Sequence, residues 1–197
     1  MPRLASPRGA SLARICEVAE QHFSARGYAG VTLKEIADAL SIRQPSLYHH
    51  VPGGKEALYV EVMLRACERH RIALFAVAGD QASPLAERLG RMAAWVLRQP
   101  AMDINRMMLA DMPQLAPRHQ RRLEEAIRSS LLAPVEQVLR DARSPLRQPL
   151  RACAGAYWAL IQSLAAVKRV APIPDEILIA QTIDLALHGI LGESNDH

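Results

Sequence analysis

The sequence has few aromatic residues and few cysteines. It contains two Phe, two Trp and four Tyr among 197 residues, whereas Ala and Leu are abundant and runs of β-branched residues are short. That balance favours helices over strands along the whole chain. The three cysteines, Cys16, Cys67 and Cys153, lie far apart and show no C-x-x-C spacing. We therefore expect no disulfide, no structural zinc site and no redox motif.

The chain also lacks a long hydrophobic run and an obvious export signal. Its most apolar stretches, near Trp95, Trp158 and Ile183, are interrupted by Arg, Lys, Gln or Asp before the roughly 18 residues that a membrane-spanning helix needs. The opening segment, MPRLASPRGAS, is not followed by the apolar segment that a signal peptide has. We expect a cytoplasmic protein that does not contact a membrane.

Enzyme motifs are missing as well. The chain contains no nucleophile elbow, phosphate-binding Gly loop, His-Glu-x-x-His motif or dinucleotide-binding fingerprint. Apart from the adjacent His49 and His50, the histidines are scattered, and the acidic residues form no obvious catalytic pair. We predict no catalytic residue, no bound metal and no cofactor. The formal net charge of +4 is compatible with a polyanionic partner but does not require one.

What is present most clearly is a motif in residues 32–58, TLKEIADALSIRQPSLYHHVPGGKEAL. Thr32 and Glu35 have the spacing of a capping box, which marks the start of a short helix. A second short helix is expected a few residues after the first, with Pro45 in its first turn. Two short helices joined by a tight turn are typical of a helix-turn-helix, whose second helix enters the DNA major groove. The first helix is indicated by apolar residues at helical spacing: Leu33, Ile36, Ala37 and Leu40.

A longer helix is expected before this motif. From Ser11 the pattern turns helical, since apolar residues between Leu12 and Phe23 recur at helical steps, and Gly27 is suited to end the helix. Residues 1–10 are rich in Pro, Gly, Ser and Arg and are predicted to form a flexible arm. In an alternative interpretation, Arg3 and Arg8 of this arm reach the minor groove of DNA.

Several short segments occur together in the N-terminal part of the chain: Arg14-Ile15, Phe23, Arg26-Gly27-Tyr28, Val31-Thr32-Leu33, Ile36-Ala37, Leu47-Tyr48-His49-His50 and Lys55-Glu56-Ala57-Leu58. This combination strongly resembles the N-terminal DNA-binding domain of TetR/AcrR-type transcriptional regulators. The rest of the chain matches that family only in its helical pattern. The resemblance implies a dimeric regulator that binds an operator and a small effector.

The second short helix is expected to carry most of the DNA contacts. Gln44 can pair with adenine, and the guanidinium of Arg43 can reach a phosphate or a guanine edge. By resemblance, Tyr48 and His49 touch the DNA backbone. Helix N-termini and ammonium groups attract phosphate, which suggests two further contacts outside this helix. The predicted DNA-binding residues are Thr32, Arg43, Gln44, Pro45, Ser46, Tyr48, His49 and Lys55.

This copy of the motif departs from the family pattern at three places. Ser41 stands in the turn where Gly is usual, so we expect strained backbone there. Arg43 replaces the usual Ser or Thr cap of the second helix. Val51, followed by Pro52-Gly53-Gly54, replaces an aromatic residue and a shorter turn. Neither of the changes at residues 51–54 removes a DNA contact that we predict.

The remaining residues predict a succession of helices separated by Pro and Gly. Ser83 is expected as an N-cap with Pro84 at the first helical position. A Met-rich helix is expected from Ala101 to Ala110, and a helix from Pro117 toward Leu139 is expected to kink near residues 130–134 because Pro134 lies inside it. The other predicted helices cover residues 55–77, 85–96, 150–170 and 175–191.

The last two predicted helices are apolar over a wide arc, so each buries more than one side. One interpretation is a thick monomer core. The other, which the family resemblance favours, is a homodimer in which these two helices of each chain form a four-helix bundle. Two recognition helices on a twofold axis would then read a pseudo-palindromic double-stranded operator.

Methionines and aromatic residues in the predicted body are candidates for an effector pocket. Met suits irregular, adaptable binding surfaces, and a helical core can enclose a small, mostly apolar ligand. Core packing alone explains these residues equally well. The candidate ligand-binding residues are Met63, Trp95, Met107, Met108, Met112, Tyr157 and Trp158.

These inferences combine into one hypothesis. We expect an all-α protein with a flexible arm at 1–10, a three-helix helix-turn-helix domain at 11–56, and a larger helical effector-binding and dimerisation domain at 57–197. Its expected function is transcriptional repression relieved by a small ligand. Two alternatives stay open: a helix-turn-helix regulator that binds a protein partner and needs no effector, and a helical-bundle enzyme with a substrate cavity.

Overall fold

The computed structural model describes residues 11–100, 102–142 and 145–191. In these residues the regular structure is helical, apart from an isolated antiparallel bridge between Leu146 and Leu191, so the all-α expectation is confirmed. The expected arm at 1–10 lies outside the described residues. The chain forms two compact units: the first contains residues up to 65 and 102–123, and the second contains residues 66–101 and those from 124 onward. The domain limits 11–56 and 57–197 stay a prediction.

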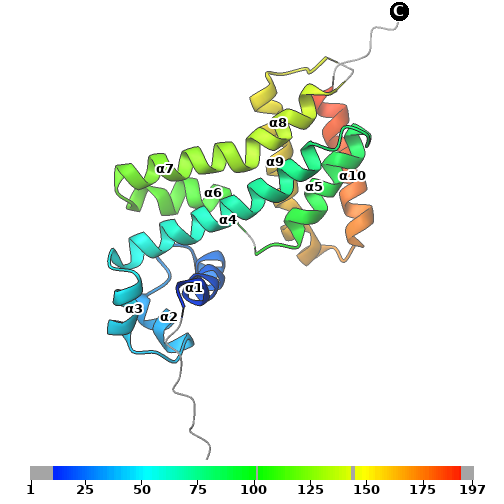
Figure 1. The fold of residues 1–197 in the computed structure, drawn as a ribbon. Helices are drawn as coiled ribbons and strands as arrows, with labels where there is room; N and C mark the ends of the chain where they lie inside the picture. Colours follow the sequence, from blue (N-terminus) through cyan, green and yellow to red (C-terminus); the bar gives the residue numbers. More distant parts are fainter. Residues whose placement is uncertain (1–10, 101, 143–144, 192–197) are drawn as a thin grey trace, which may run out of the picture. The chain divides into compact units, whose positions relative to one another are not determined.

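The first unit begins with three helices: α1 (Leu12–Arg26), α2 (Leu33–Ala39) and α3 (Gln44–His50) (Figure 1). Ser11 caps α1 by accepting a hydrogen bond from the N–H of Arg14 at 3.3 Å. Gly27 ends the helix with φ of 71°, in left-handed backbone that favours glycine. Both ends of the helix therefore lie where the sequence predicts them.

The first unit also holds the start of α4 (Gly54–Ala78) and a segment from much later in the chain. That later segment contains α6 (Ile104–Arg106), a π-helical turn (Met107–Asp111), a 3₁₀ turn (Met112–Gln114) and the start of α7 (Pro117–Ile127). The core of the three short helices includes Ile15, Phe23, Ile36 and Leu47, and the Phe23 ring packs edge-on against Tyr59 with 5.0 Å between centroids.

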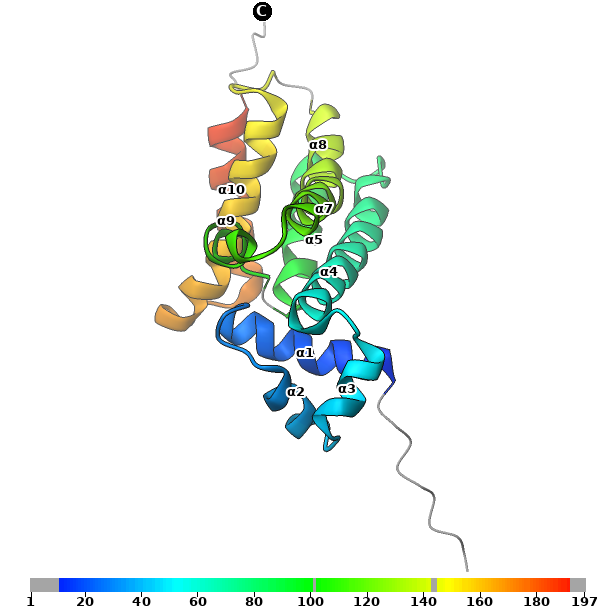
Figure 2. The ribbon, with the colours of Figure 1, turned by 90° about the vertical axis from the view of Figure 1, so that its left-hand side faces the viewer.

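The second unit is a bundle of α5 (Leu85–Leu97), α8 (Ala133–Arg140), α9 (Leu150–Val170) and α10 (Asp175–Ile190). Helix α10 packs against both α5 and α9, and α9 packs against α8 (Figure 2). Tyr157 is fully buried, and its hydroxyl donates a hydrogen bond to the carbonyl of Leu89 at 2.5 Å.

Two expectations need correction. The predicted helix at 101–110 is instead the short α6 followed by the π turn Met107–Asp111. The N-cap of α5 is Pro84 and not Ser83, because the Ser83 hydroxyl donates to Asp80 at 2.9 Å and accepts from Arg91 at 3.2 Å.

One helix bears on the expectation that the chain has no membrane-spanning segment. The segment Leu150–Lys168 of α9 is long and apolar enough, by length and composition, to cross a membrane. This is weak evidence for a span, because a core helix passes the same test. Since α9 packs against α5, α8 and α10 and buries Tyr157 and Trp158, we interpret it as a core helix.

Both π turns of the chain's described part precede a proline by two residues. The turn Met107–Asp111 precedes Pro113, and the turn Arg128–Leu132 precedes Pro134. Proline cannot donate the usual helical hydrogen bond, and its ring collides with the carbonyl four residues earlier. A wider turn moves that carbonyl aside. The kink expected near 130–134 therefore takes the form of a π turn at 128–132.

The three cysteines lie on separate helices and all are buried. Cys16 is on α1, Cys67 on α4 and Cys153 on α9, each as a free thiol. Burial raises the pKa of the Cys67 thiol to about 12. A thiol with so high a pKa is protonated and unreactive at neutral pH.

Candidate nucleic-acid interface

Helix α2 begins with the predicted capping box. The Thr32 hydroxyl accepts from the N–H of Glu35 at 3.3 Å, and the Glu35 carboxylate accepts from the N–H of Thr32 at 2.7 Å. The same carboxylate also accepts from the Thr32 hydroxyl at 2.8 Å and from the Arg26 guanidinium at 2.5 Å. Hydrogen bonds from Arg26 and then Thr32 lower the pKa of Glu35 to about 2. The capping box therefore also ties α2 to the end of α1.

The turn after α2 contains the strain expected at Ser41. Ser41 has φ of 55°, which is left-handed backbone that a residue with a Cβ adopts at a cost. Its N–H donates to the carbonyl of Asp38, and the N–H of Ile42 donates to the carbonyl of Ala37, both at 3.0 Å. These two bonds form a Schellman motif, which normally has Gly at the position of Ser41. The turn brings α3 into contact with α2.

Helix α3 is seven residues long and buries only Leu47 within its bounds. Arg43 is its N-cap residue and makes no side-chain capping bond. Tyr48 is 46% exposed although it is a large aromatic residue. The remaining residues predicted to bind DNA from this segment are also exposed: Arg43, Gln44, Pro45, Ser46 and His49. The structure therefore brings these six predicted residues together on one short, outward-facing helix and its cap.

The turn into α4 places Lys55 against an aromatic ring. The Lys55 ammonium lies 4.3 Å from the centre of the Tyr28 ring, within the range of a cation–π contact. Gly53 precedes it where an added Cβ would lie 2.5 Å from the Cβ of Ala57, so this turn has no room for a side chain. Lys55 is half-buried and held in one direction rather than free in solvent.

The model for bacterial regulatory proteins of the tetR family matches residues 15–62, which span α1, α2, α3 and the start of α4. This N-terminal part of the chain belongs to the TetR family. No functionally curated protein matches it. As a TetR-family chain, it is a DNA-binding transcriptional regulator.

Solved structures of similar fold cover nearly the whole TetR-family chain. A tetR-family regulatory protein from Rhodococcus RHA1 is 22% identical, with a TM-score of 0.70 over 96% of this chain and 100% of that one. A TetR regulator from Legionella pneumophila is 18% identical, with a TM-score of 0.73 over 96% and 100%. AibR, solved in complex with isovaleryl coenzyme A and operator DNA, is 18% identical, with a TM-score of 0.72 over 88% and 96%. At these identities the likeness establishes the fold.

Sequence reasoning missed an ion network that involves Asp111, the last residue of the first π turn. Asp111 is 4% exposed and accepts hydrogen bonds from the N–H of Tyr28 and the hydroxyl of Tyr59, both at 2.9 Å. Arg106, from the same segment, donates to the carbonyls of Phe23 and Ser24 at the end of α1, at 3.0 and 2.9 Å. The one sequence signal that could have indicated it is the lone acid inside the apolar run MMLADM.

Gly27 allows this network to close. A Cβ added at Gly27 would lie 2.9 Å from the Asp111 carboxylate and 3.3 Å from Arg106. Together with Arg106, Asp111 forms what we call the α1 clamp, which attaches residues 102–123 to the end of α1 and to the start of α4.

Sequence reasoning also missed a contact between residues 102–123 and α4. One oxygen of Glu56 accepts from the N–H of Ala116 at 2.6 Å and lies 2.8 Å from the His119 ring nitrogen Nδ1. The hydrogen bond from Ala116, followed by His119, lowers the pKa of Glu56. Glu56, the residue after Lys55, is therefore a carboxylate at neutral pH. It caps the start of α7.

The candidate ligand-binding residues fall into both units. Met63, Met107 and Met112 are buried in the first unit, where Met108 is 41% exposed. In the second unit, the His70 ring lies between two tryptophans, with centroids 4.8 Å from Trp95 and 6.2 Å from Trp158. Tyr157 is buried in the same unit.

The His70 cluster contains an unsatisfied donor. Within the described part of the chain, the His70 ring makes one hydrogen bond, between Nδ1 and the carbonyl of Ala66 at 2.8 Å, and burial lowers the pKa of His70. The indole N–H of Trp158 is buried and has no hydrogen-bond partner among the described residues. A buried donor without a partner costs free energy, which a ligand oxygen would recover.

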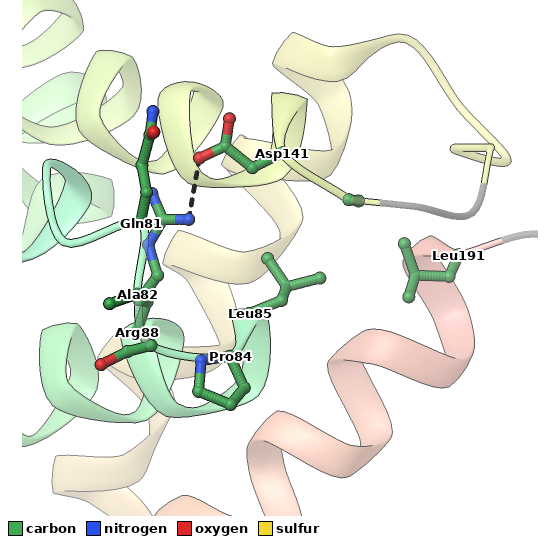
Figure 3. A pocket seen from close by; sticks show the side chains of 9 residues that line it. Gln81, Ala82, Pro84, Leu85, Arg88, Asp141 and Leu191 are labelled. Carbon is green, nitrogen blue, oxygen red and sulfur yellow. Dashed lines mark hydrogen bonds and ion pairs between the residues drawn. The ribbon is translucent and has the colours of Figure 1, made fainter.

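One cavity of the second unit, of about 820 Å³, lies beside the start of α5 (Figure 3). Arg88, only 3% exposed, donates to Asp141 at 2.8 Å and to the carbonyl of Ala78. Leu85 and Leu191 lie on two sides of the opening. The two terminal nitrogens of Arg88 are engaged by Asp141 and Ala78, whereas its buried Nε has no hydrogen-bond partner among the described residues. The cavity is therefore lined by a structural ion pair.

Proposed function

We propose that this regulator is a cytoplasmic homodimeric repressor whose operator binding is relieved by a small, mostly apolar ligand. The observation that carries the DNA-binding part is α3: an exposed helix anchored by Leu47, with Arg43 and Gln44 unengaged at its N-terminus. Neither side chain has a hydrogen bond or ion pair among the described residues. Both side chains are therefore free to form hydrogen bonds with base edges in the major groove, as Arg and Gln commonly do.

The other DNA contacts are proposed to bind phosphate. Tyr48, His49 and Ser46 are exposed along α3 and carry groups that suit phosphate oxygens. Lys55 is oriented by the Tyr28 ring. Thr32 can contact a phosphate only if its hydroxyl rotates away from Glu35, to which it already donates a hydrogen bond. The Arg26 guanidinium offsets the Glu35 charge there.

The proposal of a homodimer is supported by the exposed face of α9. Small or short residues recur on it at three- and four-residue steps, which lets another helix approach closely. On α10, Ile177 and Leu185 are 49% and 64% exposed. Such exposed apolar residues next to α9 favour a partner helix pair. The small or apolar exposed residues on this face of α9 are Ala152, Ala156, Ala159, Ser163, Ala166 and Val170.

The ligand part of the proposal is supported by the cluster of His70, Trp95 and Trp158. The cluster offers aromatic surface and one unpaired donor, a combination that suits an apolar ligand with a single acceptor oxygen. AibR, of similar fold, binds isovaleryl coenzyme A. The Trp158→Phe variant removes the donor and keeps the ring, so it should weaken binding of an acyl ligand, measured by calorimetry with isovaleryl coenzyme A and isovalerate as the first probes.

The α1 clamp offers a route from effector to DNA. It joins residues 102–123 to the end of α1, so a ligand that changes this segment changes the support of the helix-turn-helix. To relieve repression, the ligand must bind more tightly to the conformation that releases DNA. The alternative, a regulator that binds a protein partner, predicts that no small molecule changes operator affinity.

The test of the DNA-binding proposal uses Arg43→Ala and Gln44→Ala. Each is expected to weaken specific operator binding by about 1–3 kcal/mol, because each removes a base contact. Binding is measured by fluorescence anisotropy on fragments of the source genome at several salt concentrations. Arg122→Ala, which removes an exposed charge on α7, is the matched control and should leave specific binding nearly unchanged. Equal losses in all three variants, or binding with no sequence preference, would contradict the proposal.

A further inference from the structure

A second cavity, of about 540 Å³, lies between α5 and α10. Its floor is apolar, and Gly90 of α5 contributes no side chain to it. A Cβ added at Gly90 would meet Ile179 at 3.9 Å, an ordinary contact, so larger side chains there would occupy the groove. The remaining apolar floor consists of Ala86, Ala94, Ala180, Ile183 and Leu187.

The rim of this groove is predominantly acidic. Its charged residues are Glu87, Arg91, Glu176 and Asp184. The single cation, Arg91, is already paired with Asp80 at 2.7 Å and lies 3.7 Å from Glu87. Asp184 lies 3.4 Å from His188, whereas Glu176 has no ion-pair or hydrogen-bond partner within the described ranges. The rim therefore has carboxylates without a matching fixed cation.

The groove lies on a different side of α10 from the face proposed for dimerisation. The positions Glu176, Ile179, Ile183 and Leu187 recur at three- and four-residue steps and face α5. Ile177 and Leu185 lie at other angles around the helix axis. At 3.6 residues per turn, each is separated from the centre of that row by roughly a third of a turn or more. Asp184, in contrast, lies only about 20° around the helix from Ile177, so it borders the proposed dimer face. The apolar floor and Glu176 lie on the groove side of α10.

We propose that this groove binds an amphipathic organic cation. Its apolar body lies on the floor at Gly90 and Ile183, and its ammonium group faces Glu176 and Asp184. The volume is in the usual range for small-molecule sites, and an apolar surface with a few placed charges is their usual composition. An anion of the same shape is repelled by the rim, and a neutral molecule gains only the apolar contact. The site contains none of the seven candidate effector residues, so it stands independently of the proposed repressor mechanism.

The experiment compares three molecules of matched shape: 4-phenylbutylamine, which is a cation at neutral pH, 4-phenylbutan-1-ol and 4-phenylbutyrate. Binding to the full-length protein is followed by NMR titration and calorimetry at millimolar ligand. We expect the cation to bind several-fold more tightly than the alcohol and the anion to bind weakest. Equal binding of all three would overturn the proposal.

Variants locate the site. Gly90→Leu should abolish binding of the amine by filling the groove, while the Gly189→Ala control, whose added Cβ meets nothing within 4 Å, should not. Glu176→Gln should weaken amine binding about three- to fivefold, the size of one exposed charge pair. If Gly90→Leu does not fold, Glu176→Lys replaces it and should reverse the preference toward 4-phenylbutyrate. Unchanged amine binding in the Glu176 variants would refute the site.

Discussion

Ser41 is a non-glycine residue in left-handed backbone at the point where the two short helices meet. A Cβ in this conformation costs roughly 1–2 kcal/mol, although a glycine there gives back part of that through the greater freedom of the unfolded chain. The residue therefore reduces stability in the part of the molecule that orients α3. The local geometry survives because the Schellman bonds and the buried Leu47 hold it.

Replacing Ser41 by Gly should stabilise the protein. We expect a gain of about 0.5–1 kcal/mol and a rise in melting temperature of about 1–4 °C, because the left-handed conformation costs Gly nothing. Thermal unfolding followed by circular dichroism measures the change. Ser41→Ala keeps the Cβ and should show no gain; a similar rise in both variants would mean that backbone strain is not the cause.

Glu35 is expected to make stability depend on pH in the acid range. Its pKa is about 2 in the folded protein and near 4.5 without its partners, so its contribution is complete above about pH 4.5 and is lost as pH falls from there toward 2. The stability difference between the wild type and Glu35→Gln should therefore shrink as pH falls from 6 to 3. Urea titrations at each pH measure it. A difference that stays constant with pH would show that Glu35 acts through packing and not through its charge.

At the scale of elements, the π turn Met107–Asp111 has a structural and a proposed functional role. It accommodates Pro113, and it ends in the Asp111 carboxylate that binds Tyr28 and Tyr59. A regular α-helical turn would shift the residues after it along the helix surface. The position of the α1 clamp therefore depends on this turn.

Asp111→Asn tests the clamp. The amide keeps the size of the side chain and can still accept from the N–H of Tyr28, but it leaves the Tyr59 hydroxyl without an acceptor and removes the negative charge that lies 3.8 Å from Arg106. The loss should cost about 1–3 kcal/mol of stability. If the clamp supports the helix-turn-helix, operator affinity should fall as well, measured by anisotropy well below the melting temperature. Asp184→Asn, on the exposed side of α10, is the control for loss of charge. Loss of stability with unchanged operator affinity would limit Asp111 to a structural role.

Local contacts were predictable from the sequence, and distant ones were not. The capping box of Thr32 and Glu35 and the limits of α9 depend on residues close in sequence, so spacing and helix periodicity predicted them. The partner of Arg106 is the end of α1, more than 80 positions earlier, and no local pattern indicates it. The N-cap of α5 was predicted wrongly for a different reason. Asp80 and Arg91, both within eight residues of Ser83, compete with the backbone for its hydroxyl, and residue spacing does not decide that competition.

At the scale of the whole molecule, the proposed homodimer determines how DNA is read. A twofold axis would place two copies of α3 on successive half-sites of a pseudo-palindrome. A single chain would then contact one half-site and only part of the phosphates that the dimer contacts. The fraction of operator that is bound should therefore rise steeply with protein concentration near the dissociation constant of the dimer.

The variant Ala156→Arg should separate the chains. A long charged side chain on the small-residue face of α9 prevents close helix approach, so we expect a monomer by light scattering and an operator affinity reduced at least tenfold. Leu109→Arg, at a residue that is 81% exposed in the first unit, is the matched control and should remain dimeric. A dimer that persists in Ala156→Arg would place the interface elsewhere.

The α1 clamp also has a consequence for biosynthesis. The first unit is assembled from two stretches of chain, and the bonds that close it join Tyr28 to Asp111 and Phe23 to Arg106. During translation, the residues of α1, α2 and α3 are made long before Asp111 exists. The DNA-binding helices of a nascent chain therefore lack their final support until residue 111 has left the ribosome. Operator recognition by a chain still being synthesised is disfavoured by this order of events.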